Sequence, residues 1–127
     1  MKLPTDLRYT KQHEWIRTES EGRTVVVGIT DFAQGELGDI VFVELEPVDT
    51  EVGRDDAFGT VEAVKTVSEL YMPVSGRIAG INEDLQSHPE FVNEDPYGKG
   101  WMIRIETSDP SELDDLLTAD QYGDMVG

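Results

Sequence analysis

The most informative segment of the sequence reads Gly59-Thr60-Val61-Glu62-Ala63-Val64-Lys65-Thr66-Val67-Ser68-Glu69-Leu70-Tyr71-Met72-Pro73-Val74-Ser75-Gly76. Two runs of strand length, residues 57–62 and 67–72, flank a centre at 63–66, and this pattern predicts a β-hairpin. No Asn-Gly or Asp-Gly pair occupies the centre, although tight hairpins favour such pairs. The centre carries Lys65 instead, and we expect this lysine to project from the hairpin tip into solvent.

Short strands separated by turn residues continue on both sides of this hairpin. A short helix is expected from an N-cap at Thr30 to Gln34, with Gly35 as its stop. The stretch 82–100 is polar and rich in turn formers, so it is expected to form a long ordered loop. About seven short strands in one small chain predict a mostly β fold, a sandwich or flattened barrel. The further strands are expected over residues 14–18, 24–29, 39–45, 77–81 and 101–105.

The C-terminal region follows a different pattern. Asp109 is a good N-cap, Pro110 suits the first helical position, and Glu112 completes a capping box. Three leucines then recur with helical spacing, and Gly123 is a natural stop. The pattern therefore predicts one amphipathic helix that covers part of a β core, with its apolar face formed by Leu113, Leu116 and Leu117.

Composition narrows the classes of partner and chemistry. The 127 residues fit one domain, predicted over residues 1–127, and 27 acidic against 10 basic residues give a net charge of −17. Such a surface repels nucleic acid and anionic membranes, and it suits basic patches on partner proteins. The acidic excess is typical either of a salt-loving host or of an ordinary acidic carrier. The absence of cysteine excludes disulfides, thiolate metal sites and a cysteine nucleophile.

No segment of the sequence suggests a membrane or an export route. The longest apolar run, residues 24–29, is far shorter than the roughly 20 residues of a membrane helix. The first six residues contain no apolar region typical of a secretory signal. We therefore expect a cytoplasmic protein.

Several long segments, in the right order, resemble the glycine cleavage system H protein family over nearly the whole chain. The segment Gly59–Lys65 resembles the lipoylation segment of that family, and Met72–Gly76 resembles the strand that follows it. The remaining similar segments are Tyr9–Trp15, Gly28–Gln34, Leu37–Leu45, Val92–Gly98 and Gly100–Ile103.

The resemblance implies a hybrid barrel-sandwich fold with short helices and a C-terminal helix, and lipoic acid amide-linked to Lys65. The protein would be a non-catalytic carrier that shuttles the aminomethyl group of glycine from a pyridoxal-phosphate glycine decarboxylase to an aminomethyltransferase. A dihydrolipoamide dehydrogenase would reoxidise the arm, and a lipoate ligase or lipoyl transferase would attach it. The chemistry would belong to the cofactor and these partners.

Other functions remain open at this stage. A lipoate relay, or a related protein that donates lipoyl groups to other enzymes, would share the fold and the modification. A biotin carrier usually places methionines on both sides of its lysine, whereas Val64 and Thr66 stand here. A hydrolase with paired carboxylates lacks any supporting nucleophile–base pattern.

A few more residues merit an expectation. Glu14 and Glu69 match acidic positions of the family and are candidates to attract the cationic amine of the loaded arm, although both also fit solvated strand positions. His13 and His88 lie far apart in the sequence with no third metal ligand, so we expect His13 to be structural. The two tryptophans, Trp15 and Trp101, are expected in the core.

Overall fold

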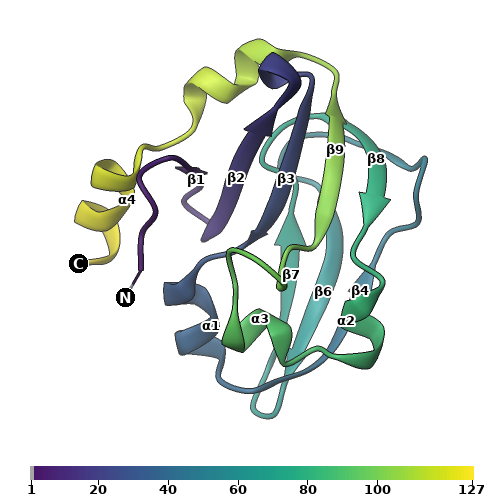
Figure 1. Cartoon of the computed structure of the whole chain (residues 1–127), viewed down its shortest axis with the longest axis vertical. Coiled ribbons are helices and arrows are strands. Elements are labelled where there is room, and N and C mark those ends of the chain that lie inside the picture. Colours follow the sequence, from purple (N-terminus) through teal and green to yellow (C-terminus); the bar gives the residue numbers. More distant parts are fainter. Residues whose placement is uncertain (1) are drawn as a thin grey trace.

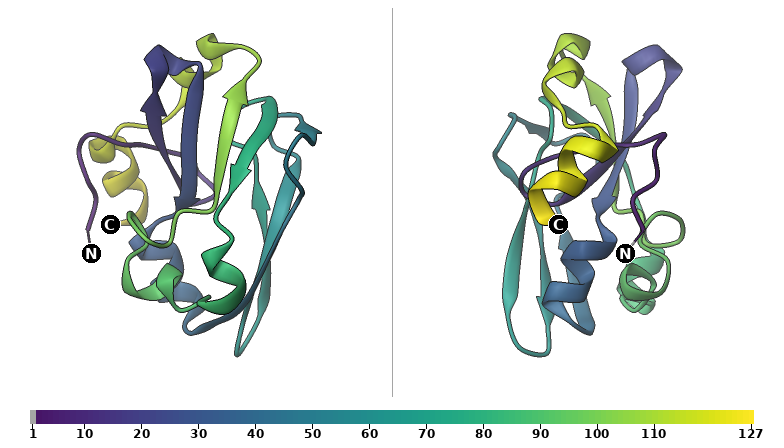
Figure 2. Two further views of the ribbon diagram at one scale, coloured as in Figure 1. Left: turned by 45° about the vertical axis from the view of Figure 1, so that its right-hand side comes forward. Right: turned by 90° about the vertical axis from the view of Figure 1, so that its left-hand side faces the viewer.

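The protein forms two antiparallel β-sheets that lie face to face, with helices at their ends and one side (Figures 1 and 2). The computed structural model describes residues 2–127, so residue 1, with which the predicted domain begins, lies outside the described residues. The large sheet has six strands in the order β1-β2-β3-β9-β8-β5, and the small sheet has three in the order β4-β6-β7. The strands are β1 Arg8–Tyr9, β2 Glu14–Glu19, β3 Thr24–Ile29, β4 Ile40–Leu45, β5 Glu51–Val52, β6 Ala57–Ala63, β7 Val67–Tyr71, β8 Gly76–Ile81 and β9 Ile103–Thr107.

The main core lies between the inner faces of the two sheets. Alternate residues of each strand point inward, as expected for sheets with one buried face. The small sheet contributes Val43, Val61 and Leu70, and the large sheet contributes a row of buried β-branched residues, among them Ile16, Val25, Val27, Ile78, Ile103 and Ile105. Burial of these side chains supplies the principal driving force for folding. The expectation of a mostly β sandwich is confirmed.

A second apolar cluster covers the N-terminal edge of the large sheet. Trp15 is fully buried there, and its indole N–H donates a 2.9 Å hydrogen bond to the carbonyl of Pro96. The rings of Tyr9 and Tyr122 stack with centroids 4.9 Å apart, which joins the C-terminal helix to β1. Trp15 is therefore a core residue as expected, while Trp101 is partly buried at the edge of the same cluster.

Three elements before the C-terminal region differ from the expectation, namely the first helix, the long loop and the last strand. The first helix, α1 (Asp31–Leu37), begins at Thr30 but passes through Gly35 and ends at Gly38, which has a positive φ of 79°. The second turn of α1 forms because it packs Leu37 against the core. The expected loop 82–100 contains two short helices, α2 (Asp84–Ser87) and α3 (Phe91–Glu94), each with one buried anchor residue. The last strand covers residues 103–107 rather than 101–105.

A C-terminal helix is present as expected, but the prediction that one continuous helix begins at Asp109 is wrong. Asp109 does cap a helix, but this is a short 3-10 helix, η2 (Pro110–Asp115), and Glu112 accepts a hydrogen bond from the Ser75 amide instead of completing a capping box. The chain then extends because Leu117 pairs with Tyr9 through two backbone hydrogen bonds of 2.8 and 2.9 Å. A new helix, α4 (Ala119–Val126), begins with a capping box of Thr118 and Gln121, and Gly123 lies inside it.

The remaining described elements are minor. A 3-10 turn, η1 (Ser20–Gly22), joins β2 to β3. No helix among residues 2–127 is long and apolar enough to span a bilayer.

Candidate functional site

Lys65 lies at the tip of the β6–β7 hairpin, which extends to the lower end of the molecule in Figure 1. The Ala63 amide donates to the Thr66 carbonyl at 2.7 Å and closes the tip, and the Val64 amide donates to the Asp39 carbonyl at 3.2 Å. Neither Val64 nor Lys65 has a positive φ, which explains why the tip needs no Asn-Gly pair. Lys65 is exposed on this braced turn, as the sequence predicted.

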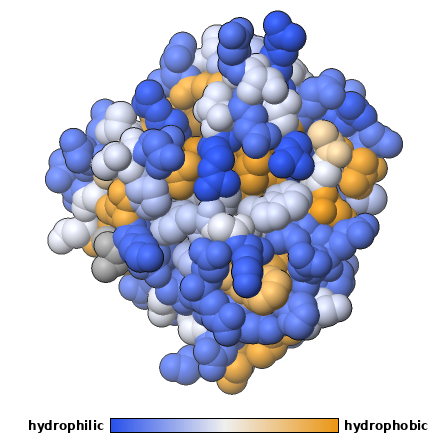
Figure 3. All heavy atoms as spheres, viewed as in Figure 1, coloured by the Kyte–Doolittle hydropathy of each residue, from blue (hydrophilic) through white to orange (hydrophobic). Residues whose placement is uncertain are grey.

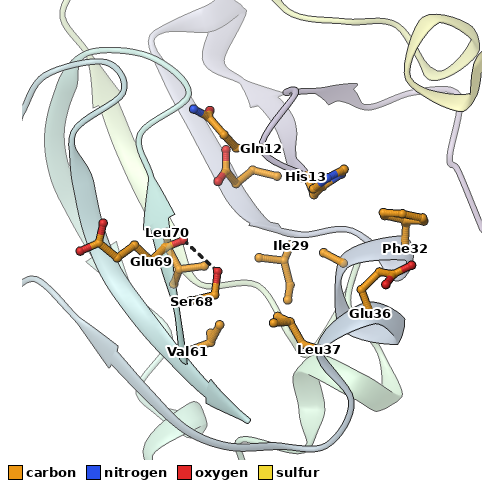
Figure 4. A pocket seen from close by; sticks show the side chains of 12 residues that line it. Gln12, His13, Ile29, Phe32, Glu36, Leu37, Val61, Ser68, Glu69 and Leu70 are labelled. Carbon is orange, nitrogen blue, oxygen red and sulfur yellow. Dashed lines mark hydrogen bonds between the residues drawn. The ribbon is translucent and has the colours of Figure 1, made fainter. Parts of the chain in front are cut away.

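A cleft of about 420 Å³ opens beside the hairpin strands (Figure 4). One wall is β7 with Val61 of β6, the opposite wall is α1, and the turn before β2 closes one end. Apolar atoms form most of the surface that lines the cleft, which suits a short aliphatic chain. The lining residues are Gln12, His13, Glu14, Ile29, Phe32, Ala33, Glu36, Leu37, Val61, Ser68, Glu69 and Leu70.

Glu14 is the buried acid of this cleft, with 1% of its surface exposed. Its carboxylate accepts a 2.7 Å hydrogen bond from the Thr10 hydroxyl and a 3.3 Å hydrogen bond from the Tyr71 amide. Burial raises the pKa of Glu14 to about 7, although both hydrogen bonds act in the opposite direction. A carboxyl group that ionises near neutral pH inside an apolar cleft is typical of a functional position.

Glu69, the second candidate acid, occupies a different position from Glu14. In Figure 4 its side chain points away from His13 and Phe32, toward the outer side of the hairpin. Its carboxylate accepts a hydrogen bond from the Tyr71 hydroxyl at 3.0 Å. Glu69 therefore lies at the rim of the cleft and remains exposed.

A hydrogen-bonded group fixes the end of the cleft, where the turn before β2 meets the start of α1. The hydroxyl of Tyr122 lies 2.8 Å from His13 Nδ1 and 2.8 Å from Thr30 Oγ1. Thr30 in turn caps α1 by accepting from the Ala33 amide at 3.1 Å. Burial lowers the pKa of His13, and the charge of Glu36 opposes that shift. Besides its structural role, His13 thus lines the cleft, a position that sequence reasoning missed.

Sequence reasoning also missed Thr10 and Tyr122, which hold residues of the cleft lining without lining it themselves. Thr10 bonds to Glu14, four residues away, whereas Tyr122 reaches His13 from the distant C-terminal helix. His13 and His88 do not approach one another in any metal-ligating group, since no cluster of three or more candidate ligands occurs within residues 2–127.

Comparisons with known proteins place the chain in a family. The model of the family described as Glycine cleavage H-protein matches residues 7–127. The glycine cleavage system H protein of Staphylococcus haemolyticus is 61% identical over 127 residues, which is 100% of this chain and 99% of that protein. The protein of the same name from Salinibacter ruber is 63% identical over 126 residues, with 99% and 100% of the two chains covered.

A solved structure supports the same assignment. The crystal structure of a glycine cleavage system H protein from Mycobacterium marinum superposes with a TM-score of 0.89 at 38% sequence identity. The match covers 98% of each chain, so the two proteins share one fold over nearly their whole length. This chain belongs to the glycine cleavage H-protein family, the lipoyl carriers of the glycine cleavage system.

Proposed function

We propose that the chain is a single, non-catalytic lipoyl-carrier domain in which lipoic acid is amide-linked to Lys65. The observation that carries this proposal is the exposed lysine on a braced hairpin tip, whose strands form one wall of a largely apolar cleft. An amide on Nζ removes the charge of Lys65 and lengthens its flexible stem. The dithiolane ring of lipoate supplies a sulfur that accepts the aminomethyl group, together with a two-electron redox couple.

The cleft suits a protective role for the cargo. Ile29, Leu37 and Leu70 exclude water from its walls, and exclusion of water slows hydrolysis of a labile group. The cargo carries a cationic amine, and the buried carboxylate of Glu14 is the charge that attracts it. We assign Glu69 only to the rim, where it adds negative potential at the entrance.

The partners are the enzymes that attach, load, unload and reoxidise the lipoyl arm. We propose that the arm visits a pyridoxal-phosphate glycine decarboxylase, an aminomethyltransferase and a dihydrolipoamide dehydrogenase, after a lipoate ligase or lipoyl transferase attaches it, all in the cytoplasm. A tether raises the effective concentration of the cargo at each partner without tight binding. The net charge of −17 favours basic surfaces on these proteins.

Peptide mass spectrometry on protein isolated from its own host tests the assignment of Lys65. The expected result is a mass gain of one lipoyl group on Lys65 alone. Lys65→Arg should abolish both the mass gain and glycine-dependent turnover with the partner enzymes, while the free energy of unfolding changes by less than about 0.5 kcal/mol, as for other surface changes.

Two results contradict this proposal in different ways. A lipoylated protein that supports little glycine turnover would indicate a lipoate relay. A large loss of stability in Lys65→Arg would show that Lys65 has a structural role and that the tip is misinterpreted.

A further inference from the structure

The outer face of the small sheet exposes apolar side chains around Lys65. Val64 and Val67 are 72% and 60% exposed on the hairpin, and Val41 and Phe42 are 49% and 44% exposed on the neighbouring strand β4. In Figure 3, hydrophobic residues emerge at the lower end of the molecule, where Figure 1 shows the hairpin. Exposed apolar residues that gather in this way indicate an interaction surface.

Strand register places two of these side chains in one row. Phe42 pairs with Glu62, and Glu62 pairs with Val67, so all three point to the outer face. An irregularity in register between Ile40 and Phe42 leaves both Val41 and Phe42 exposed. The core of the sandwich is filled by other residues of the same strands, so these four side chains are available for a partner.

The next row on the outer face, farther from the hairpin tip, lines an acidic hollow of about 390 Å³. Glu44 pairs with Thr60, and Thr60 pairs with Glu69, while Glu46 lies at the edge of the same hollow. No Lys or Arg among residues 2–127 lies within ion-pair distance of these three carboxylates. A partner that covers the hollow would therefore gain favourable contacts by bringing its own cation.

We propose that this surface, which we name the hairpin face, is the docking site of the enzyme that attaches the lipoyl group to Lys65. The hairpin face comprises Val41, Phe42, Val64 and Val67 with the hollow of Glu44, Glu46 and Glu69. The surface of the enzyme that meets it pairs an apolar patch with a Lys or Arg that enters the hollow. This inference rests on the function proposed above.

The distance between Lys65 and the atoms that react favours the attaching enzyme as the partner at this surface, over the enzymes that later act on the lipoyl arm. Attachment joins Nζ of Lys65 to the carbonyl carbon of an activated lipoyl group, an acyl-adenylate. The amide bond forms as the acyl–phosphate bond breaks, AMP leaves, and the amine proton passes to a base or water. The attaching enzyme must therefore hold Lys65 at bonding distance and contact the residues beside it, whereas enzymes that act on the sulfurs meet the far end of a flexible arm.

The first test measures lipoyl attachment to the purified, unmodified chain. A lipoate ligase is supplied with lipoate and ATP, and intact mass spectrometry follows the initial rate. The double variant Val64→Thr/Val67→Thr keeps β-branched side chains and should lower kcat/KM about tenfold through KM, because interfacial apolar contacts are lost. Met125→Gln, at an exposed position on α4, is the matched control, and its kcat/KM should stay within about twofold of that of the chain without substitutions.

The second test removes charge from the hollow. Glu44→Gln/Glu46→Gln should lower kcat/KM several-fold and flatten its dependence on salt, as expected for electrostatic docking. Glu51→Gln/Glu94→Gln removes the same number of charges from exposed positions elsewhere and should leave both quantities unchanged.

A third measurement separates attachment from the later cycle. Each variant is lipoylated to completion with excess ligase and assayed for glycine-dependent turnover, which should match that of the lipoylated chain without substitutions. The inference is overturned if the hairpin-face variants are lipoylated at the normal rate, or if turnover falls as much as attachment. If the chain without substitutions fails to accept a lipoyl group on Lys65, that result contradicts the proposed function itself.

Discussion

Val61 and Val64 lie three residues apart on the same hairpin, in opposite surroundings. Val61 is fully buried and contributes to both the core and the cleft wall, whereas Val64 is 72% exposed beside Lys65. The charged groups of the two regions differ in the same way, because Glu14 is buried in the cleft and Lys65 is solvated at the tip. The cleft is thus part of the packed interior, and the tip lies outside it.

This difference shows two physical routes to a functional surface. At the tip, apolar side chains remain in water and contribute little to folding, so they are free to serve recognition. In the cleft, a carboxyl group is taken out of water, which costs stability when the group is ionised. We expect mutations at the tip to affect recognition alone, and mutations in the cleft to affect stability and function together.

The largest expected contrast in stability is between the two valines. Val61→Ala should lower the free energy of unfolding by about 2–3 kcal/mol, because it removes buried methyl groups and leaves a cavity. Val64→Ala should change it by less than about 0.5 kcal/mol, because Val64 is mostly in solvent. Urea unfolding of both variants at one pH measures the contrast. Equal losses would mean that the tip packs as tightly as the cleft wall.

Glu14→Gln should stabilise the protein while it impairs the cleft. The usual pKa of a glutamate is 4.5, and burial raises that of folded Glu14 to about 7. Between these values the folded state holds a proton that the unfolded chain releases, so this group lowers stability as pH rises through the window. A glutamine side chain cannot ionise, and the variant should therefore be more stable by ~1–3 kcal/mol at pH 8 and nearly unchanged at pH 4.5.

Urea unfolding at pH 4.5 and pH 8 measures this difference. Glutamine can still accept from the Tyr71 amide and can donate to the Thr10 hydroxyl, so the hydrogen bonds survive the change. Loss of negative charge should also speed hydrolysis of the aminomethyl cargo by about tenfold, measured as released formaldehyde. A destabilised variant with a fully protected cargo would contradict both the raised pKa and the proposed role of Glu14.

The tip could be predicted from the sequence because its information is local. Two strand-like runs around Lys65 suffice to predict a hairpin, and the family resemblance adds the modification. The hairpin face was not predicted, because it depends on the register that pairs Phe42 with Glu62 and Glu62 with Val67. Strand register is set by long-range packing of one face, which a single strand pattern does not specify.

The cleft was harder to predict because distant segments build it. Glu14 was a candidate from resemblance, but no local pattern indicates its burial or its contact with Tyr71. The C-terminal prediction failed for the same reason. Asp109 and the leucine spacing favoured one helix, while the backbone pairing of Leu117 with Tyr9 extends the chain and splits it. Local capping signals cannot report such a pairing.

Tyr122→Phe tests whether this distant helix holds the cleft in shape. The variant loses the hydroxyl contacts to His13 and Thr30 but keeps the aromatic ring stacked on Tyr9. It should lower the free energy of unfolding by about 1 kcal/mol, the typical net contribution of such hydrogen bonds. Amide hydrogen exchange should quicken at Ala33, whose N–H is held by the Thr30 hydroxyl.

Tyr9→Phe is the matched control for this variant. It removes a hydroxyl from the same aromatic cluster, but that hydroxyl donates to the Pro4 carbonyl at 2.6 Å and does not contact the cleft. We expect a similar loss of stability without faster exchange at Ala33, and normal lipoyl attachment to Lys65 in both variants. Equal exchange at Ala33 in the two variants would mean that α4 stabilises the sheet edge without shaping the cleft. Faster exchange in Tyr122→Phe alone would make the C-terminal helix part of the device that shelters the cargo, because that hydroxyl links α4 to the turn that closes the cleft and to the cap of α1.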